Sequence, residues 1–311
     1  MSVIFESLVP IFLLVACGVW LKRARFLAPT LWEGLEQLGY YVLFPALLFS
    51  TLATAHFQGL KTDATAAATI GGVLIMSACV LALWPLLKAR GVSASTFTSL
   101  FQTATRWNGF MALAAAERLY GTTGLTLTAL VMTLIIVPIN FVNIGVLIWF
   151  NGGPRNLRFF AMRILSNPMV SASLAGIALN LAGTPVYAPA MSAVRMLAES
   201  SLPLGLIMVG AGLRLGDLVR PKPLVFLSGA LKLILMPIFM VGLAALSGVR
   251  GDALLTIALG ASVPTAMNGY LLAKQMGGDA PFYAVSATLQ MVASFLTIPL
   301  VLTAAAYLAA G

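Results

Sequence analysis

Residues 99–116 read SLFQTATRWNGFMALAAA and residues 257–273 read IALGASVPTAMNGYLLA, so each apolar stretch carries an Asn-Gly step well inside it. Asn-Gly is a turn signal and glycine is costly inside a helix, which predicts that both hydrophobic helices break at these steps. The steps Asn108-Gly109 and Asn268-Gly269 lie 160 positions apart. This spacing indicates an internal duplication.

Prolines repeat at almost the same offset. Pro45 and Pro203 are 158 positions apart, and Pro138 and Pro299 are 161 positions apart. Matched interruptions in two halves of a membrane protein are typical of the binding site of a transporter. Two interpretations of Pro45 and Pro203 stay open: a hinge or substrate-lining kink, or the ordinary bend that proline introduces into a transmembrane helix.

The composition predicts an all-α integral membrane protein. Hydrophobic residues make up 60% of the chain and charged residues 9%, against roughly 25% charged residues in a soluble domain. The net charge of +9 does not indicate a nucleic-acid partner, because the basic residues lie in short connections between apolar runs. With about 20 residues for each span, the chain has ten candidate transmembrane helices. They lie near 3–21, 31–53, 64–87, 95–119, 125–150, 164–181, 189–213, 224–247, 253–276 and 282–309.

Basic residues in the connections predict the orientation in the membrane. Twelve lie after odd-numbered spans and four after even-numbered spans. Because basic connections stay in the cytoplasm, both termini are expected on the periplasmic side of a bacterial cytoplasmic membrane. The twelve are Lys22, Arg23, Arg25, Lys88, Arg90, Arg155, Arg158, Arg163, Arg214, Arg220, Lys222 and Lys274; the four are Lys61, Arg118, Arg195 and Arg250.

The most basic connection, residues 151–163, divides the chain into residues 1–150 and 164–311 with five spans each. An odd number of spans makes the second half enter the membrane in the opposite direction. We therefore expect two inverted five-helix repeats, in which the fourth and ninth helices break at the same depth and cross.

The predicted site gathers around the two breaks. Asn108, Gly109, Asn268 and Gly269 mark them, and Pro264 removes an amide donor just ahead of the second. Half-helix amino ends offer amide groups to an anion, and the asparagines supply donors and acceptors. The alternative is that each asparagine caps a kink in a packed bundle; the duplication favours a binding site.

Charged residues at membrane depth leave two interpretations open. The Arg106 guanidinium suits a carboxylate ligand, or it forms a permanent ion pair with Glu117 or Glu199. Glu199 is a candidate proton carrier, or it neutralises Arg195 one turn away. The same two interpretations apply to Lys232: it carries a proton, or it forms an ion pair. Trp107 either stacks on a substrate or faces lipid, and Asn140, Asn143 and Gln290 are interpreted as contacts between helices.

The sequence carries no pattern typical of an enzyme, a metal site or a cofactor site. His56 is the sole histidine and has no acidic or cysteine neighbours at the spacing of metal ligands. The chain lacks a Walker-type phosphate loop, which excludes the usual form of ATP-driven transport. Transport would therefore be passive or driven by a gradient.

Five motifs, in this order and spacing, resemble the auxin efflux carrier family, which includes plant PIN-type carriers and bacterial transporters of malate, malonate and related acids. They are LFPALLFSTLA at 43–53, RWNGFMALA at 106–114, SLPLGLIMVGAGL at 201–213, VPTAMNGYLLAKQMGGD at 263–279 and SFLTIPLVL at 294–302. The resemblance implies inverted repeats, a crossover of helices four and nine at the substrate site, and a homodimer. The family's crossover asparagines map to Asn108 and Asn268, and one of its prolines to Pro264; no proline precedes Asn108.

From these observations we expect a secondary transporter for small organic anions, such as malate, malonate or auxin-like acids. Its mechanism would be alternating access, in which one helix set rocks or slides like an elevator against the other. One alternative is a sodium-coupled symporter of the bile-acid-transporter fold, although apolar Trp107 and Met267 beside the asparagines suit sodium poorly. The other is a membrane sensor that binds a ligand without moving it.

Overall fold

The computed structural model describes residues 2–24, 27–28, 30–55, 62–152, 166–219, 222–267 and 269–310, and every regular element in these ranges is helical. The first half holds α1 (Ser2–Arg23), α2 (Leu31–Leu38), η1 (Gly39–Leu43), α3 (Phe44–Ala53), α4 (Thr62–Ala82), α5 (Trp84–Ala89), α6 (Ala94–Thr105) and α7 (Gly109–Asn151). The second half holds α9 (Pro168–Leu181), α10 (Ala188–Ala211), η2 (Leu215–Val219), α11 (Pro223–Ala230), η3 (Leu231–Leu235), α12 (Met236–Leu246), α13 (Gly251–Ser262), α14 (Gly269–Gln275) and α15 (Ala280–Ala310).

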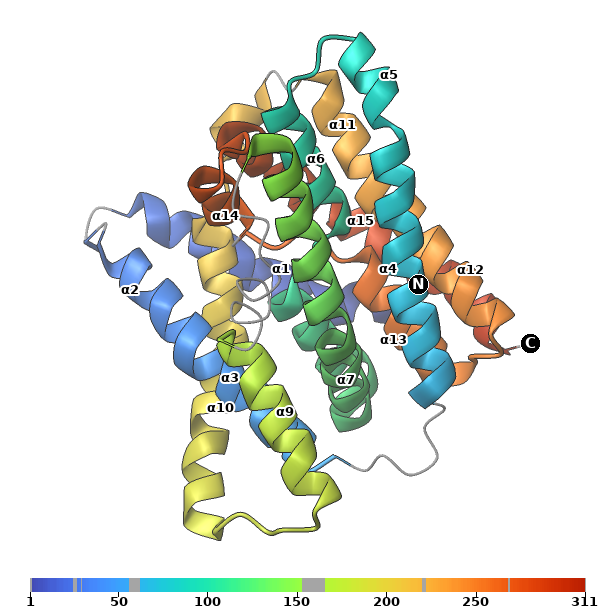
Figure 1. Cartoon of the computed structure of the whole chain (residues 1–311). Helices are drawn as coiled ribbons and strands as arrows, with labels where there is room; N and C mark the ends of the chain where they lie inside the picture. Colours follow the sequence, from blue (N-terminus) through green and yellow to red (C-terminus); the bar gives the residue numbers. More distant parts are fainter. Residues whose placement is uncertain are drawn as a thin grey trace.

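Helices occupy all ten predicted spans over most of their described lengths. Among the described residues, six helical stretches are long and apolar enough to cross a membrane, as expected of a multi-pass membrane protein. The connection from α5 to α6 lies at the top of Figure 1, and the connection from α9 to α10 lies at the bottom. The assignment of ten spans to two inverted repeats stays a prediction.

The long helix α7 contains parts of two predicted spans. Gly121 in its interior has φ 61° and ψ −151°, a conformation that glycine adopts readily and other residues avoid. The chain kinks there, so residues 109–120 complete the fourth span and residues 122–151 form the fifth. The predicted boundary near 119–125 is thus where the helix is interrupted.

Two helices contain a π-helical turn directly ahead of a proline. The turn η1 precedes Pro45 of α3, and the turn η3 precedes Pro237 of α12. Proline lacks an amide hydrogen and its ring crowds the carbonyl four residues earlier, so the preceding turn widens instead of continuing as regular α-helix. Pro45 is buried, and Pro203 lies inside α10.

The helices pack as two sets (Figure 1). The first helix set consists of α1, the α2–η1–α3 run, α9 and α10, in which α3 packs on α9 and α1 packs on α10. The second helix set contains α4, α6, α7 and the helices α11 to α15, with α12 on α4 and α13 on α15. Helix α7 contacts α1, α3 and α10, so it forms much of the boundary between the sets.

Helices α1 and α10 approach each other closely through glycines. A Cβ atom on Gly18 would lie 2.0 Å from the Ile207 carbonyl oxygen, and one on Gly210 would lie 1.9 Å from the Val15 carbonyl oxygen. Such backbone-to-backbone contact is typical of tightly associated membrane helices. It makes the first helix set a rigid unit.

Candidate substrate site at two broken helices

The first helix break lies between α6 and α7. Helix α6 ends at Thr105, and Arg106 has an extended backbone with φ −74° and ψ 152°. Asn108 restarts the helix as an N-cap, because its side-chain Oδ1 accepts a hydrogen bond from the Met111 amide at 3.2 Å. The local sequence thus breaks the helix where the Asn-Gly step predicted.

The second break lies between α13 and α14. Val263 adopts an extended conformation, with φ −67° and ψ 151°, as expected of a residue before proline. Helix α13 ends at Ser262, ahead of Pro264, and α14 begins at Gly269. A Cβ atom on Gly269 would lie 2.1 Å from the Tyr283 hydroxyl, so only glycine fits here. Asn268 lies outside the described residues.

The two breaks meet. The Asn108 amide donates a hydrogen bond of 2.8 Å to the Pro264 carbonyl oxygen, although the residues are 156 positions apart. The two breaks are therefore in contact, and we call this place the crossing; that it relates two inverted repeats stays a prediction. Four half-helices converge on it, and the amino end of α7 places a positive helix dipole there.

Gln290 on α15 satisfies backbone groups that the breaks set free. Its Oε1 accepts from the Thr265 amide at 2.9 Å, and its Nε2 donates to the Thr103 carbonyl at 3.1 Å and to the Ser228 hydroxyl at 2.9 Å. Buried unpaired amides are costly, so this side chain stabilises both broken helices at once. The interpretation of Gln290 as a contact between helices understated its role at the crossing.

Arg106 is buried, with 7% of its surface exposed. Its Nη2 donates to Asn140 Oδ1 at 3.3 Å, and this is its one side-chain hydrogen bond to the described part of the chain. The Tyr283 and Tyr40 hydroxyls lie within electrostatic range of the guanidinium. The proposed ion pair with Glu117 or Glu199 is absent from the described structure, because both acids line a separate cavity.

Several polar atoms at the first break have no hydrogen-bond partner within the described residues. They include Arg106 Nε, Asn108 Nδ2 and Trp107 Nε1, and both polar side-chain atoms of Gln102 one turn earlier. Native proteins leave few buried polar atoms unpaired, and each such atom points to a missing ligand or water. Three of the four residues offer only donors at these atoms, which suits an anion.

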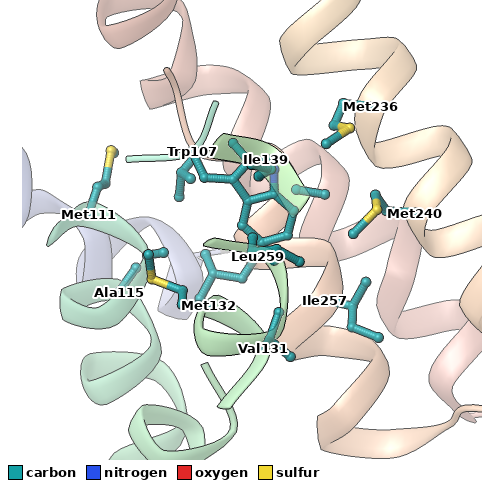
Figure 2. Packing of buried hydrophobic residues seen from close by; sticks show 14 of the residues in the cluster. Trp107, Met111, Ala115, Val131, Met132, Ile139, Met236, Met240, Ile257 and Leu259 are labelled. Carbon is teal, nitrogen blue, oxygen red and sulfur yellow. The ribbon is translucent and has the colours of Figure 1, made fainter. Parts of the chain in front are cut away.

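Trp107 does not face lipid. Its side chain is 5% exposed, and Figure 2 shows the indole among apolar side chains that include Ile139 and Leu259. A Cβ atom on Gly260 would lie 2.3 Å from the indole ring, so α13 passes directly against it. Trp107 therefore packs the crossing, and the interpretation that it faces lipid is wrong; stacking on a substrate stays a prediction.

A cavity of about 860 Å³ lies between the two helix sets, lined by α1, α3, α7 and α10. Glu117 and Arg118 of α7 face it together with Arg195 and Glu199 of α10. Pro203 also lines it, whereas Pro45 does not. The predicted Arg195–Glu199 ion pair is likewise absent from the described residues, where both side chains are exposed.

An aromatic pair packs at the start of α7, between the first break and the cavity-lining residues of that helix. The rings of Phe44 and Phe110 meet edge to face, with centroids 4.5 Å apart. Phe110 directly follows Gly109, and the cavity-lining Ala114 lies one turn further along α7. Phe110 fills the space over Gly205 of α10, where a Cβ atom would lie 2.0 Å from its ring. We call Phe44 and Phe110 the aromatic pair.

Comparisons with known proteins agree with this architecture. Residues 154–302 match the model of a family described as "Membrane transport protein". An uncharacterized transporter of Methanothermobacter thermautotrophicus is 24% identical over 296 residues, covering 95% of this chain and 96% of that protein. The protein is thus a membrane transporter by class. Both matches agree with the resemblance to the auxin efflux carrier family.

Proposed function

We propose that the protein is a secondary transporter of small organic anions, with the carboxylate held at the crossing of the broken helices. One observation carries the proposal: Arg106 Nε and Asn108 Nδ2 are buried donors without a partner in the described structure. A carboxylate is the ligand class that satisfies a guanidinium and an amide donor together. Malate, malonate and auxin-like acids belong to this class.

The surroundings of the crossing support an anion. Arg106 has no acidic partner among the described residues, so its charge is available to a ligand. The amino end of α7, which begins directly after Asn108, adds partial positive charge at the same place. A bound anion would offset the cost of burying the arginine charge, which is large in the absence of a partner.

The cavity supports a route to the site. It reaches from Arg118 and Arg195 down to Ala114, and the aromatic pair stands between it and Asn108. On the other side of the crossing the two helix sets are joined, because Arg214 Nη2 donates to the Tyr270 hydroxyl at 3.1 Å and the Arg214 amide donates to Thr288 Oγ1 at 3.0 Å. These features support a state in which the cavity end is open and the Arg214 end is closed.

Alternating access would follow from a movement of the second helix set against the first. The boundary between the sets contains the cavity at one end and the Arg214 contacts at the other, and exchanging open and closed ends would expose the crossing to the opposite side. The positive-inside bias supports periplasmic termini, and then the cavity opens to the periplasm. A homodimer is part of this proposal, from the family resemblance.

The test is binding and uptake of carboxylates by purified protein in proteoliposomes. Arg106→Lys keeps the charge and loses the guanidinium fork, so we expect a higher Kd and slower uptake with little change in folding. Arg250→Lys is the matched control, because Arg250 is exposed and donates to the nearby Ala245 and Val249 carbonyls. Equal affinity and uptake in wild type and Arg106→Lys would contradict the proposal, and binding without uptake would favour a sensor.

A further inference from the structure

Lys232 is the most deeply buried charged residue that the proposed anion site does not use. It lies in the π-helical turn η3, and its surface is 0% exposed. Pro237 follows this widened turn, and the Lys232 side chain reaches the last turn of α13. An ammonium group at this depth needs a partner or a function.

The Lys232 ammonium joins the two broken helices. Its Nζ donates a hydrogen bond of 2.8 Å to the Ala261 carbonyl oxygen, in the last turn of α13. It also lies 5.3 Å from the centroid of the Trp107 ring, in the break between α6 and α7. A cation over an indole face is attracted by the ring quadrupole. No acidic side chain of the described residues approaches the ammonium.

The Ala261 carbonyl needs this partner because the helix ends there. In a continuing helix it would accept from the amide three or four residues later. The first of these is Pro264, which has no amide hydrogen, and the second is Thr265, whose amide donates to Gln290. The break therefore leaves a buried carbonyl at the negative end of a half-helix dipole.

In transporters with broken helices, such exposed carbonyls and half-helix carboxyl ends coordinate a bound sodium ion or proton. We propose that the Lys232 ammonium is the resident cation of this crossing, held covalently at the place where a sodium-coupled carrier binds its ion. The proposed anion transport then requires no sodium. The position of the cation is defined by Ala261, Trp107 and Lys232 alone. Only the conclusion that transport needs no sodium rests on the proposed function.

Thermal stability without any substrate tests the cation position. The wild-type protein should melt at the same temperature in sodium chloride and in choline chloride of equal ionic strength. Lys232→Ala should melt several degrees lower, because the Ala261 carbonyl loses its partner, and methylammonium or sodium should restore part of the loss in a saturable way. Lys222→Ala, which removes an exposed lysine ahead of α11, is the matched control and should show neither effect.

A saturable rise of the wild-type melting temperature with sodium would overturn the proposal. It would also be overturned if Lys232→Ala melted like the wild type, or if neither methylammonium nor sodium stabilised it. Should Lys232→Ala not fold, the wild-type sodium titration still decides. We expect uptake of the carboxylate to be equal in sodium and choline buffers. If uptake is absent in both buffers while the melting temperatures behave as predicted, the proposed function alone is contradicted.

Discussion

Replacing Asn108 separates its two roles at the crossing. Its Oδ1 caps α7 through the Met111 amide, whereas its Nδ2 is buried without a partner in the described structure. Serine is also a good N-cap, so Asn108→Ser keeps the cap and removes the amide donor. Asn108→Ala removes both. It should therefore lower the free energy of unfolding by about 1 kcal/mol relative to Asn108→Ser.

The affinity change follows from the lost donor. A hydrogen bond to a charged group contributes about 1.5–3 kcal/mol, which corresponds to about one to two decades in Kd. Both variants should therefore bind carboxylates about 10- to 100-fold more weakly, while Asn108→Ser melts close to the wild type. Unequal affinities of the two variants would show that the cap, and not the donor, controls binding.

The assay is calorimetric titration of a carboxylate into purified protein, together with a melting curve for each variant. Asn167→Ser is the matched control, because Asn167 also caps a helix, with its Oδ1 accepting from the Met169 amide at 3.0 Å in the first helix set. Its affinity should equal that of the wild type. Wild-type affinity in Asn108→Ser would refute the assignment of Nδ2 to the ligand.

Three further predictions concern the route and the orientation. Labelling from each side of the membrane should place both termini outside and residues 151–163 inside; termini on opposite sides would contradict the inverted repeats. In Gly205→Ala the new Cβ atom would lie 2.0 Å from the ring of Phe110 and should displace it. The variant should therefore have a lower melting temperature and slower uptake. If both values are unchanged, the aromatic pair does not separate the cavity from the site. Tyr270→Phe removes the hydroxyl that accepts a hydrogen bond from Arg214 at 3.1 Å. Cysteines introduced at the crossing should then react faster with thiol reagents added from the cytoplasmic side. An unchanged reaction rate would show that this contact does not close the cytoplasmic side.

Local sequence signals predicted the breaks correctly. Asn108-Gly109 and Pro264 act on the backbone within a few residues, so their effect on the helix is readable without knowledge of the fold. The crossing itself followed from the regular offset between the two halves, and the bond from the Asn108 amide to Pro264 has the expected partners. The same reasoning predicts Arg106 as a site residue, and the structure places it in the first break.

Contacts between distant segments were not predictable in this way. Lys232 lies in a π-helical turn and meets Ala261 and Trp107, and the hydropathy pattern carries no trace of that turn. Gln290 bridges three segments through the backbone groups of Thr265, Thr103 and Ser228, which any sequence would offer. The expected ion pairs of Glu117 and Glu199 are absent from the described structure, and both residues line a cavity that local sequence patterns do not reveal.

The position of the bound anion tests the central claim most directly. A crystal structure with a bromine-substituted carboxylate would locate the ligand by anomalous scattering, independently of transport. We predict the carboxylate within hydrogen-bond distance of Arg106 Nε and Asn108 Nδ2, beyond the aromatic pair. A ligand found instead in the cavity beside Arg118 and Arg195, with the crossing unoccupied, would contradict the account.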